Sequence, residues 1–280
     1  MSYFKLKSHA KINLALNVIG KSNSLHKIES IVSFLRLHDE ILIKKIKERK
    51  HKIKFIGKFS KKIKSKNTVS KLFEIIDKKK ILKDKYQIII KKNIPSEAGL
   101  GGGSMNAASI LKFLIKRKLI KIGKKEIFQI SNLIGFDVVL GLYAKNLILN
   151  SNNTIKTFSI KKKKYVLIIK PNFGCKTREI FSGVKKFSKS KFSPASKKMF
   201  SVGFLRKMKN DLEPITLNKY QKLNDLKKYL EKLSNIEFVR MTGSGSALIV
   251  YFKSGKKCED AGKKVKKKFR NYWCKTSKTI

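Results

Sequence analysis

The sequence has 280 residues, of which 41% are hydrophobic, and this is enough for one large domain or two ordinary ones with real cores. No apolar run approaches the roughly 20 residues that a membrane-spanning helix needs, and the first residues lack the pattern of a cleaved leader. The three cysteines have no metal-ligand spacing and fit a reducing compartment. We therefore expect a cytoplasmic protein without membrane association.

The net charge of +50 has two interpretations. It could indicate a nucleic-acid or membrane-surface binder, because basic side chains attract phosphate whatever its sequence. It could also be a compositional bias toward lysine on any tolerant surface. Lysine outnumbers arginine, is spread over nearly every segment, and is not interleaved with aromatic residues as in a base-stacking surface. We expect no specific nucleic-acid partner, although weak attraction to polyanions is expected in either case.

Strand and helix patterns follow one another through the first half of the chain. Residues Lys11 to Gly20 alternate between apolar and polar side chains, which indicates a half-buried strand with Lys11 and Asn13 on its polar face. Asn67 is placed as the N-cap of a helix whose apolar residues follow at helical spacing. The other expected elements are strands at Glu40–Lys45, Lys52–Phe55 and Tyr86–Ile94, helices at Asn106–Lys118 and Glu126–Ile134, and strand-forming sequence at Asp137–Leu149.

A polar, lysine-rich run at 151–164 predicts the boundary between two domains, residues 1–155 and 156–280. The Lys/Ser-rich stretch 185–198 is expected to be a mobile surface loop. Strands and helices alternate without strict βαβ order, which favours an α+β fold with antiparallel or mixed sheets. The second half is expected to contain strands at Tyr165–Ile169, near Phe238, at Ala247–Phe252 and at the C-terminus, and helices at Arg178–Phe181, Leu223–Leu233 and Lys257–Phe269.

A glycine-rich loop follows the triple-isoleucine strand, with four glycines within five residues. Glycine lets backbone N–H groups approach an anion, and a helix start adds unpaired donors and the positive end of its dipole. The alternative, a plain strand–helix turn, needs fewer residues and less glycine. The absence of a following Gly-Lys-Ser/Thr excludes a P-loop, and the absence of a βαβ frame excludes a dinucleotide fingerprint. The expected phosphate-binding residues are Pro95, Ser96, Glu97, Ala98, Gly99, Leu100, Gly101, Gly102, Gly103, Ser104 and Met105.

The loop Pro95 to Ser104 resembles the second motif of the galactokinase, homoserine kinase, mevalonate kinase and phosphomevalonate kinase superfamily. The turn Met241 to Ser246 resembles its third motif. Within that superfamily the chain resembles the 4-diphosphocytidyl-2-C-methyl-D-erythritol kinases, in the same order along nearly the whole chain. The segments that carry this resemblance are Ala10-Lys11-Ile12-Asn13-Leu14, His26-Lys27-Ile28-Glu29-Ser30, Gly135-Phe136-Asp137-Val138 and Asn210-Asp211-Leu212-Glu213-Pro214.

The resemblance implies a two-domain kinase with its site in the cleft between the domains. The N-terminal domain would resemble the second domain of ribosomal protein S5, and the C-terminal domain would be ferredoxin-like. The enzyme would use ATP and Mg²⁺ to phosphorylate the 2-hydroxyl of cytidine diphosphate methylerythritol, in isoprenoid (terpenoid) biosynthesis by the non-mevalonate pathway. It would be a monomer or weak homodimer. The sequence does not identify the metal ligands.

The resemblance assigns Asp137 as the catalytic aspartate and Lys11 as the catalytic lysine. A carboxylate can accept the proton of the attacking hydroxyl, and an ammonium beside it can stabilise charge on the transferring phosphoryl group. Such a pair, an N–H cradle and Mg²⁺ suffice for phosphoryl transfer. The residues alone also allow Asp137 to be a helix-stop aspartate and Lys11 a surface lysine. Ser104 could cap the following helix or bind metal, with capping preferred, and Glu97 could point away from the phosphates or touch the metal.

For the substrate, the resemblance assigns Asn13, His26, Thr177, Phe181, Gly243 and Ser244. His26 would contact the cytosine, and Phe181 would lie against one face of the ring. The family often has an aromatic residue before the histidine, where this chain has Leu25. Val139 and Phe136 replace the family's usual proline and small residue beside Asp137.

Two alternatives remain at this point. One is another kinase of the superfamily, of the homoserine or mevalonate type, which the His26 and Asn210 segments disfavour. The other is an RNA-binding protein that uses an S5-like fold and the basic surface. Rising salt should separate a kinase from an RNA-binding protein, because RNA affinity falls steeply with salt while ATP turnover should fall far less.

Overall fold

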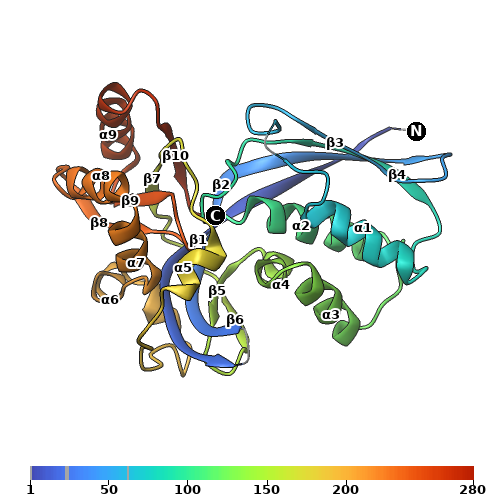
Figure 1. Cartoon of the computed structure of the whole chain (residues 1–280), viewed down its shortest axis with the longest axis horizontal. Coiled ribbons are helices and arrows are strands. Elements are labelled where there is room, and N and C mark those ends of the chain that lie inside the picture. Colours follow the sequence, from blue (N-terminus) through green and yellow to red (C-terminus); the bar gives the residue numbers. More distant parts are fainter. Residues whose placement is uncertain (1, 23–24, 62) are drawn as a thin grey trace. The chain divides into compact units, whose positions relative to one another are not determined.

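The structure is a computed structural model that describes residues 2–22, 25–61 and 63–280 (Figure 1). It divides into two compact units. Unit 1 comprises Met1–Lys11, Leu37–Ser96 and Gly101–Ala144, and unit 2 comprises Ile12–Arg36, Glu97–Leu100 and Lys145–Ile280. The long strands β1 (Phe4–Ser22) and β2 (Leu25–Ile46) contribute residues to both units. The expected domains 1–155 and 156–280 stay a prediction, because these units are defined by packing alone and interleave along the chain.

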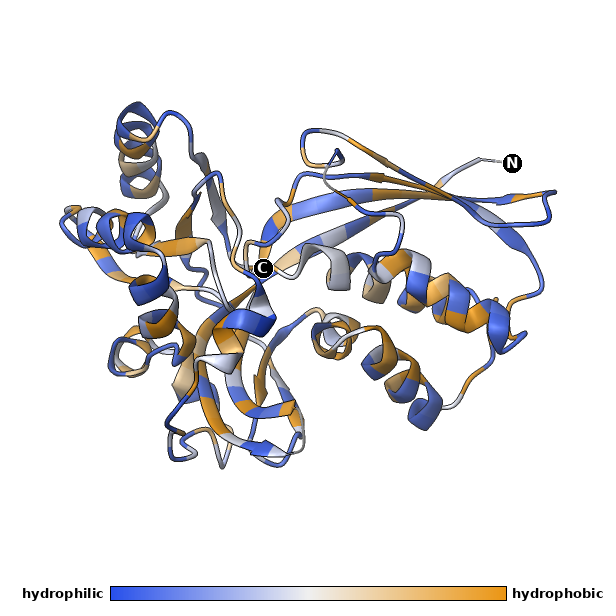
Figure 2. Cartoon of the chain, viewed as in Figure 1, coloured by the Kyte–Doolittle hydropathy of each residue, from blue (hydrophilic) through white to orange (hydrophobic). Residues whose placement is uncertain are grey.

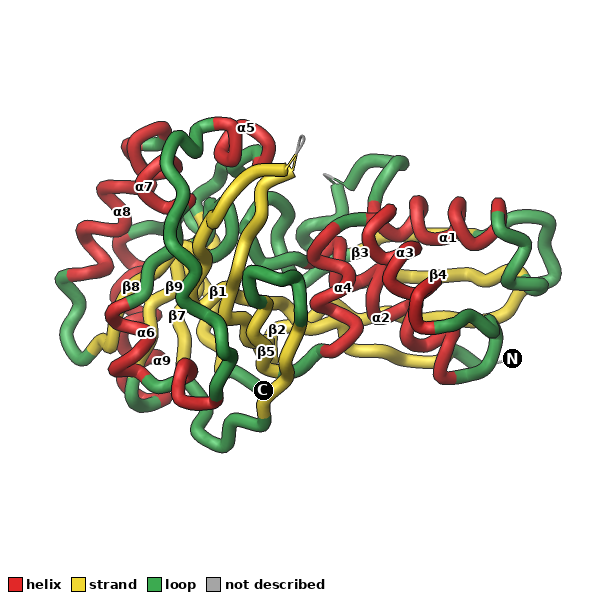
Figure 3. Tube along the Cα trace, turned by 90° about the horizontal axis from the view of Figure 1, so that it is seen from below, coloured by secondary structure: helices red, strands yellow, loops and turns green. Residues whose placement is uncertain are grey.

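Unit 1 is a sheet covered on one face by helices, as Figures 1 and 3 show. Strand β3 (Lys52–Ile56) pairs parallel to β4 (Lys85–Lys91), and β4 pairs antiparallel to residues 40–46 of β2. Apolar side chains of the sheet, such as Ile41, Ile88 and Ile90, form one core with those of the helices. The helices are α1 (Thr68–Lys78), α2 (Gly102–Lys116), α3 (Lys124–Ile134) and α4 (Phe136–Tyr143).

A local cap fixes the start of one of these helices, and a close tertiary contact fixes another. The side chain of Asn67 accepts hydrogen bonds from the N–H groups of Val69 and Ser70, so it caps α1 as expected. Helix α4 packs closely on α2 because it presents a glycine there. A Cβ on Gly141 would stand 2.6 Å from Cβ of Ala108.

Unit 2 contains a four-stranded antiparallel sheet in the order β10-β7-β9-β8. Its bounds are β7 (Tyr165–Lys170), β8 (Ile236–Met241), β9 (Leu248–Phe252) and β10 (Trp273–Lys278). The unit also holds β5 (Asn146–Leu149) and β6 (Ile155–Phe158), which extend from residues 30–32 of β2. Its helices are α5 (Thr177–Ser182), α6 (Val202–Lys207), α7 (Leu212–Lys219), α8 (Gln221–Glu231) and α9 (Gly255–Lys268), with a short 3₁₀ helix at Lys197–Phe200.

Helices α8 and α9 have one apolar side each, and Figure 2 shows hydrophobic positions among mostly hydrophilic turns. In α9 the buried residues Cys258, Ala261 and Val265 recur at helical spacing and join the core of the sheet. The α+β class expected from the sequence is confirmed. In the part of the chain that the structure describes, no helix is both long and apolar enough to cross a membrane.

The largest error of the sequence prediction concerns residues 137–149. We expected strand, but residues 136–143 form α4 and only Asn146–Leu149 is a strand. Val138 and Val139 are β-branched, and a short apolar run does not separate a buried strand from a buried helix. Packing on α2 decides in favour of helix. Helices α6 and α7 were not predicted either.

The stretch 185–198 was expected to be a mobile surface loop, and at its centre this is wrong. Phe192 is fully buried, and the buried carboxylate of Glu29 accepts hydrogen bonds from Ser190 Oγ at 2.8 Å and from the N–H of Lys191 at 2.7 Å. Residue Glu29 lies on β2, so the stretch is tied to the sheet of its own unit.

Candidate active site

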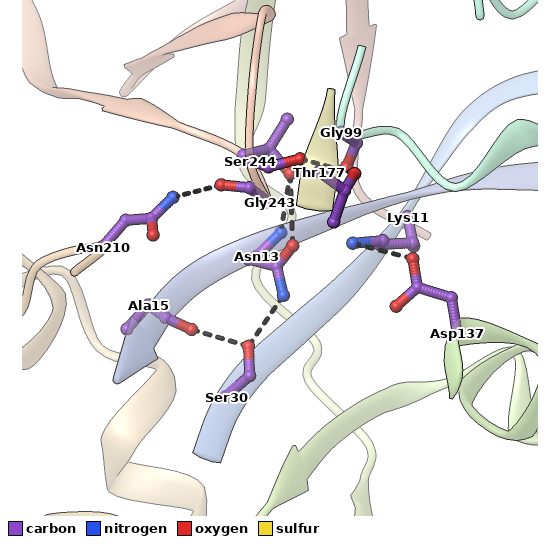
Figure 4. Close-up of polar contacts among 11 residues, drawn as sticks. Lys11, Asn13, Ala15, Ser30, Gly99, Asp137, Thr177, Asn210, Gly243 and Ser244 are labelled. Atoms are coloured by element: carbon purple, nitrogen blue, oxygen red, sulfur yellow. Dashed lines mark hydrogen bonds and ion pairs between the residues drawn. The ribbon is translucent and has the colours of Figure 1, made fainter. Parts of the chain in front are cut away.

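An ion pair joins β1 to the start of α4 in unit 1. The ammonium of Lys11 lies 3.3 Å from Oδ2 of Asp137, and Figure 4 shows the two side chains pointing toward each other. The side chain of Lys11 is 4% exposed, whereas that of Asp137 is 32% exposed. Asp137 follows the end of α3 at Ile134, as expected, and also occupies the first turn of the unpredicted helix α4. One carboxylate oxygen is therefore held by the lysine while the group still reaches solvent.

The second half of the glycine loop lies against this ion pair. Gly101 has a left-handed φ of 67°, and a Cβ there would stand 2.9 Å from Cγ of Lys11 and 3.6 Å from Oδ2 of Asp137. Only glycine fits a backbone that is both left-handed and this close to another chain segment. The structure thus brings Lys11, Asp137 and the loop together within one unit.

Helix α2 begins earlier than expected, at Gly102, with Gly101 as its N-cap. Its first hydrogen bond runs from the N–H of Met105 to the carbonyl oxygen of Gly101. The N–H groups of Gly102, Gly103 and Ser104 therefore belong to the helix start, where they point away from the helix and carry the positive end of its dipole. The prediction that Ser104 caps the helix is wrong, because Ser104 lies inside the first turn.

The first half of the loop packs against the turn at 242–247 in unit 2. A Cβ on Gly99 would stand 1.9 Å from the carbonyl oxygen of Thr242, and both Gly99 and Gly243 have left-handed φ values, 69° and 54°. The N–H of Ser246 donates to the carbonyl oxygen of Glu97 at 3.2 Å, and that of Ala247 donates to Ala98 at 3.3 Å. The two glycine turns are thus fitted backbone to backbone.

Glu97 is exposed and has a left-handed φ of 51°. Its side chain lies beside Gly174, where a Cβ would stand 2.2 Å from Oε2 of Glu97. The other residues expected in the loop fall into two groups by burial. Gly99, Gly101, Gly102, Gly103, Ser96 and Ser104 are at least partly accessible, whereas Pro95, Ala98, Leu100 and Met105 are buried.

Hydrogen bonds connect the expected substrate residues of unit 2. The N–H of Asn13 donates to Oγ1 of Thr242 at 3.0 Å, and its side-chain amide donates to Oγ of Ser30 at 2.8 Å (Figure 4). The hydroxyls of Thr177 and Ser244 lie 2.9 Å apart. Asn210 donates to the carbonyl oxygens of Met241 at 2.9 Å and Gly243 at 2.8 Å, which fixes the turn from its other side.

His26 and Phe181 lie together in unit 2, with ring centroids 5.2 Å apart and a 42° tilt. A third ring, Phe187, lies 6.5 Å from His26 and is 49% exposed, and Leu25 is 76% exposed. Partial burial, and then the charge of Lys21, lower the pKa of His26 below its ordinary 6.5. Phe187 was not predicted as a site residue, because the Lys/Ser-rich composition of 185–198 indicated a surface loop. The signal was an aromatic residue inside a lysine- and serine-rich run.

Neither a metal site built from several protein side chains nor a reactive thiol is found among the described residues. Within residues 2–22, 25–61 and 63–280 no group of three or more His, Cys, Asp or Glu side chains could hold a metal ion. Burial raises the pKa of Cys175 to about 11 and that of Cys258 to about 12. At neutral pH these thiols are protonated, which makes them poor nucleophiles.

Known proteins resemble this chain over its whole length. It is 53% identical to a 4-diphosphocytidyl-2-C-methyl-D-erythritol kinase from Pelagibacter ubique, with 100% of both chains covered. It is 29% identical to the kinase of the same name from Clostridium tetani, over 99% of this chain and 100% of that one. Residues 67–145 match the family described as GHMP kinases N terminal domain.

Two solved structures show the same fold. A crystal structure of 4-(cytidine 5'-diphospho)-2C-methyl-D-erythritol kinase has a TM-score of 0.76 at 19% identity and covers 98% of this chain and 99% of its own. A homoserine kinase from Cytophaga hutchinsonii has a TM-score of 0.72 at 16% identity, with 100% and 95% covered. At such identities the likeness concerns fold alone.

Proposed function

The chain belongs to the 4-diphosphocytidyl-2-C-methyl-D-erythritol kinase family, and from this membership we propose the reaction and the residues that perform it. The protein transfers the γ-phosphoryl group of ATP to the 2-hydroxyl of 4-diphosphocytidyl-2-C-methyl-D-erythritol, a step of isoprenoid precursor synthesis by the non-mevalonate pathway. The observation that carries this proposal is the packing of Gly101 against the Lys11–Asp137 ion pair. A carboxylate and an ammonium therefore lie beside the glycine-rich start of a helix, which supports a phosphoryl-transfer site.

The loop from Pro95 to Met105 binds the phosphates of ATP. The backbone donors of Gly102, Gly103 and Ser104 open helix α2, and the absence of side chains at the two glycines lets phosphate oxygens approach them. Mg²⁺ would accompany ATP, bound mainly by phosphate and water oxygens as is usual for this ion. The hydroxyl of Ser104, which does not cap the helix, is the protein oxygen that we assign to it. When bound, the ion would neutralise phosphate charge.

Asp137 is the general base. Its carboxylate is partly exposed, so a substrate hydroxyl can reach it and give up its proton as the oxygen attacks phosphorus. Lys11 holds one oxygen of this carboxylate in place. Its ammonium would stabilise the negative charge that develops on the transferring group. Lys11 is nearly fully buried and packs against Gly101, so its side chain has little room to move.

The cytidine end of the substrate binds in unit 2. A neutral His26 has one donor and one acceptor nitrogen, which suits the polar edge of cytosine. Phe181 offers a ring for one face of the base, and Phe187 takes the place of the aromatic residue that Leu25 does not supply. Asn13, Thr177, Gly243 and Ser244 provide polar groups for the rest of the molecule.

Release of ADP tests the reaction. The parent is expected to turn over the cytidine compound and not homoserine, mevalonate or galactose. Asp137→Asn should lower kcat by about 10²-fold or more, because general-base catalysis typically contributes this much. The partly exposed site should let the variant fold, which a melting temperature close to the parent's would verify. Equal turnover by parent and variant would remove Asp137 from the mechanism, and turnover of homoserine or mevalonate would favour the related kinases.

Phe187→Ala tests the base subsite separately. Stacking on an aromatic ring contributes about 1–3 kcal/mol per base, so KM for the cytidine substrate should rise by about tenfold while KM for ATP is unchanged. Phe4→Ala is the control, since Phe4 is similarly exposed but lies in unit 1, against Phe113. An unchanged KM in Phe187→Ala, or an equal change in the control, would exclude Phe187 from the subsite.

A further inference from the structure

A single buried carboxylate bonds to the chain on both sides of the glycine loop. Asp39 lies on β2 in unit 1 and is fully buried. Its Oδ1 accepts hydrogen bonds from the N–H groups of Asn93 at 2.7 Å and Ile94 at 2.9 Å. Its Oδ2 accepts from the ammonium of Lys92 and from the side-chain amide of Asn106 at 3.1 Å.

These partners are placed at the two ends of the loop. Asn93 and Ile94 follow the last residue of β4 and precede Pro95. Asn106 lies on α2, fully buried, just after the residues whose N–H groups open that helix. The Oδ1 atom therefore fixes the backbone before the loop, and the Oδ2 atom fixes the helix after it.

The ion pair of Asp39 and Lys92 also brings an ammonium group close to the loop. The side chain of Lys92 is 3% exposed, and a buried ammonium is tolerated only with a close counter-charge. Its Nζ lies 3.3 Å from the position that a Cβ on Gly102 would occupy. Asp39 thus holds a cation beneath the first residue of α2, where phosphate is proposed to bind.

We propose that Asp39 is a positioning residue for ATP. It does not touch the nucleotide but holds the two ends of the loop, and Lys92 beneath it, at the spacing that phosphate needs. This inference rests on the proposed function of the loop. An ordinary structural ion pair would stabilise unit 1 without a selective effect on ATP, and that difference can be measured.

The first test is Asp39→Asn, which keeps the shape of the side chain and loses one acceptor oxygen and the charge. The new amide NH₂ would then face other donors. These would be the donor groups of Lys92 and Asn106 in one orientation of the amide, or the N–H groups of Asn93 and Ile94 in the other. KM for ATP is expected to rise by about tenfold or more, because small displacements of binding groups are costly. KM for the cytidine substrate should stay within about twofold.

Asp77→Asn is the matched control. Asp77 also joins elements of unit 1, through Lys85 at 2.6 Å and His51 at 3.2 Å. It lies near the end of α1, roughly 13 Å along the helix from Thr68, at 1.5 Å per residue. Thr68 faces the loop at Gly103. The control should lower the melting temperature without a change in either KM. If Asp39→Asn folds and its KM for ATP equals that of the control, the proposal is wrong.

Asn106→Ala keeps the test decisive if Asp39→Asn does not fold, since it removes only the contact after the loop. Its KM for ATP should rise by about threefold or more, as expected for the loss of one buried hydrogen bond. An unchanged KM in this variant would overturn the proposal. Failure of the proposed function would look different, because the parent itself would then release no ADP with the cytidine substrate.

Discussion

Among the many lysines of this chain, Lys11 is the one that the proposed reaction requires. Most lysines are exposed, but this one is buried beside Asp137 and Gly101. Lys11→Met should fill the same space and leave Asp137 partly exposed, so the protein should fold. We expect kcat to fall about 10²–10³-fold, as for the loss of one transition-state donor, with KM for ATP changing far less.

Lys7→Met is the control for that variant, because Lys7 lies on the same strand and is exposed. Steady-state ADP release for the parent and both variants gives the comparison. A Lys11→Met enzyme with the kcat of the Lys7 control would mean that the ion pair serves folding alone.

The lowered pKa of His26 predicts a pH dependence of substrate binding. Burial and Lys21 favour the neutral ring, so at pH 7 the imidazole keeps its acceptor nitrogen. As pH falls below 6.5 and through the lowered pKa, the ring gains a proton and loses that acceptor. KM for the cytidine substrate should therefore be constant above about pH 7 and rise in acid.

His26→Gln isolates this effect, since glutamine keeps a donor and an acceptor but does not titrate. The KM of the variant for the cytidine substrate, measured across the same pH range at saturating ATP, should not rise in acid. Any change caused by titration of the substrate or of ATP would appear equally in both proteins and can be subtracted. Equal pH profiles for parent and variant would show that His26 does not hydrogen-bond the cytosine.

At the scale of elements, the fitted glycine turns of unit 2 make Gly99 irreplaceable. An alanine there would meet the carbonyl oxygen of Thr242 at 1.9 Å and would be strained by its left-handed φ of 69°. Gly99→Ala should displace the loop, lower the free energy of unfolding and reduce ADP release at least about tenfold.

Gly203→Ala provides the contrast within the same unit. Gly203 lies in α6, where an added Cβ would meet no described atom within 4 Å beyond its chain neighbours and the backbone of its own helix. Alanine there should stabilise by about 0.5–1 kcal/mol. Denaturant unfolding and ADP release measure both variants. If Gly99→Ala unfolds at the parent's midpoint and keeps full activity, the contact between the two turns has no role.

Elements with strong local signals could be predicted, and those made by packing could not. Neighbouring residues alone indicate the cap at Asn67, the isoleucine-rich strand β4 and the glycine loop that follows it. Helix α4 forms because Gly141 lets it approach α2, which no local pattern reveals. The role proposed for Asp39 likewise depends on partners that are more than fifty residues away.

At the scale of the whole molecule, most of the excess lysine lies on the surface, while two of the scarce carboxylates organise the interior. Asp39 and Glu29 are fully buried and accept several hydrogen bonds each. Helix α9 shows where the positive charge lies. Its buried face is apolar, and its exposed positions are mostly lysine, at 256, 257, 263, 264, 266, 267 and 268. Such a charge is screened by salt and does not depend on the geometry of any one site.

This division predicts different salt dependences for the two activities that the charge could support. If about six lysines contact a single-stranded RNA, its affinity should fall roughly 10³-fold between about 50 and 300 mM KCl, through counterion release. Turnover of ATP is proposed to depend on a preformed loop and a partly buried ion pair, so kcat/KM should fall less than about tenfold over that range. Fluorescence anisotropy with RNAs of several sequences, beside ADP release, measures both. Tight binding that survives high salt and prefers one sequence would restore an RNA-binding function, because counterion release alone produces neither.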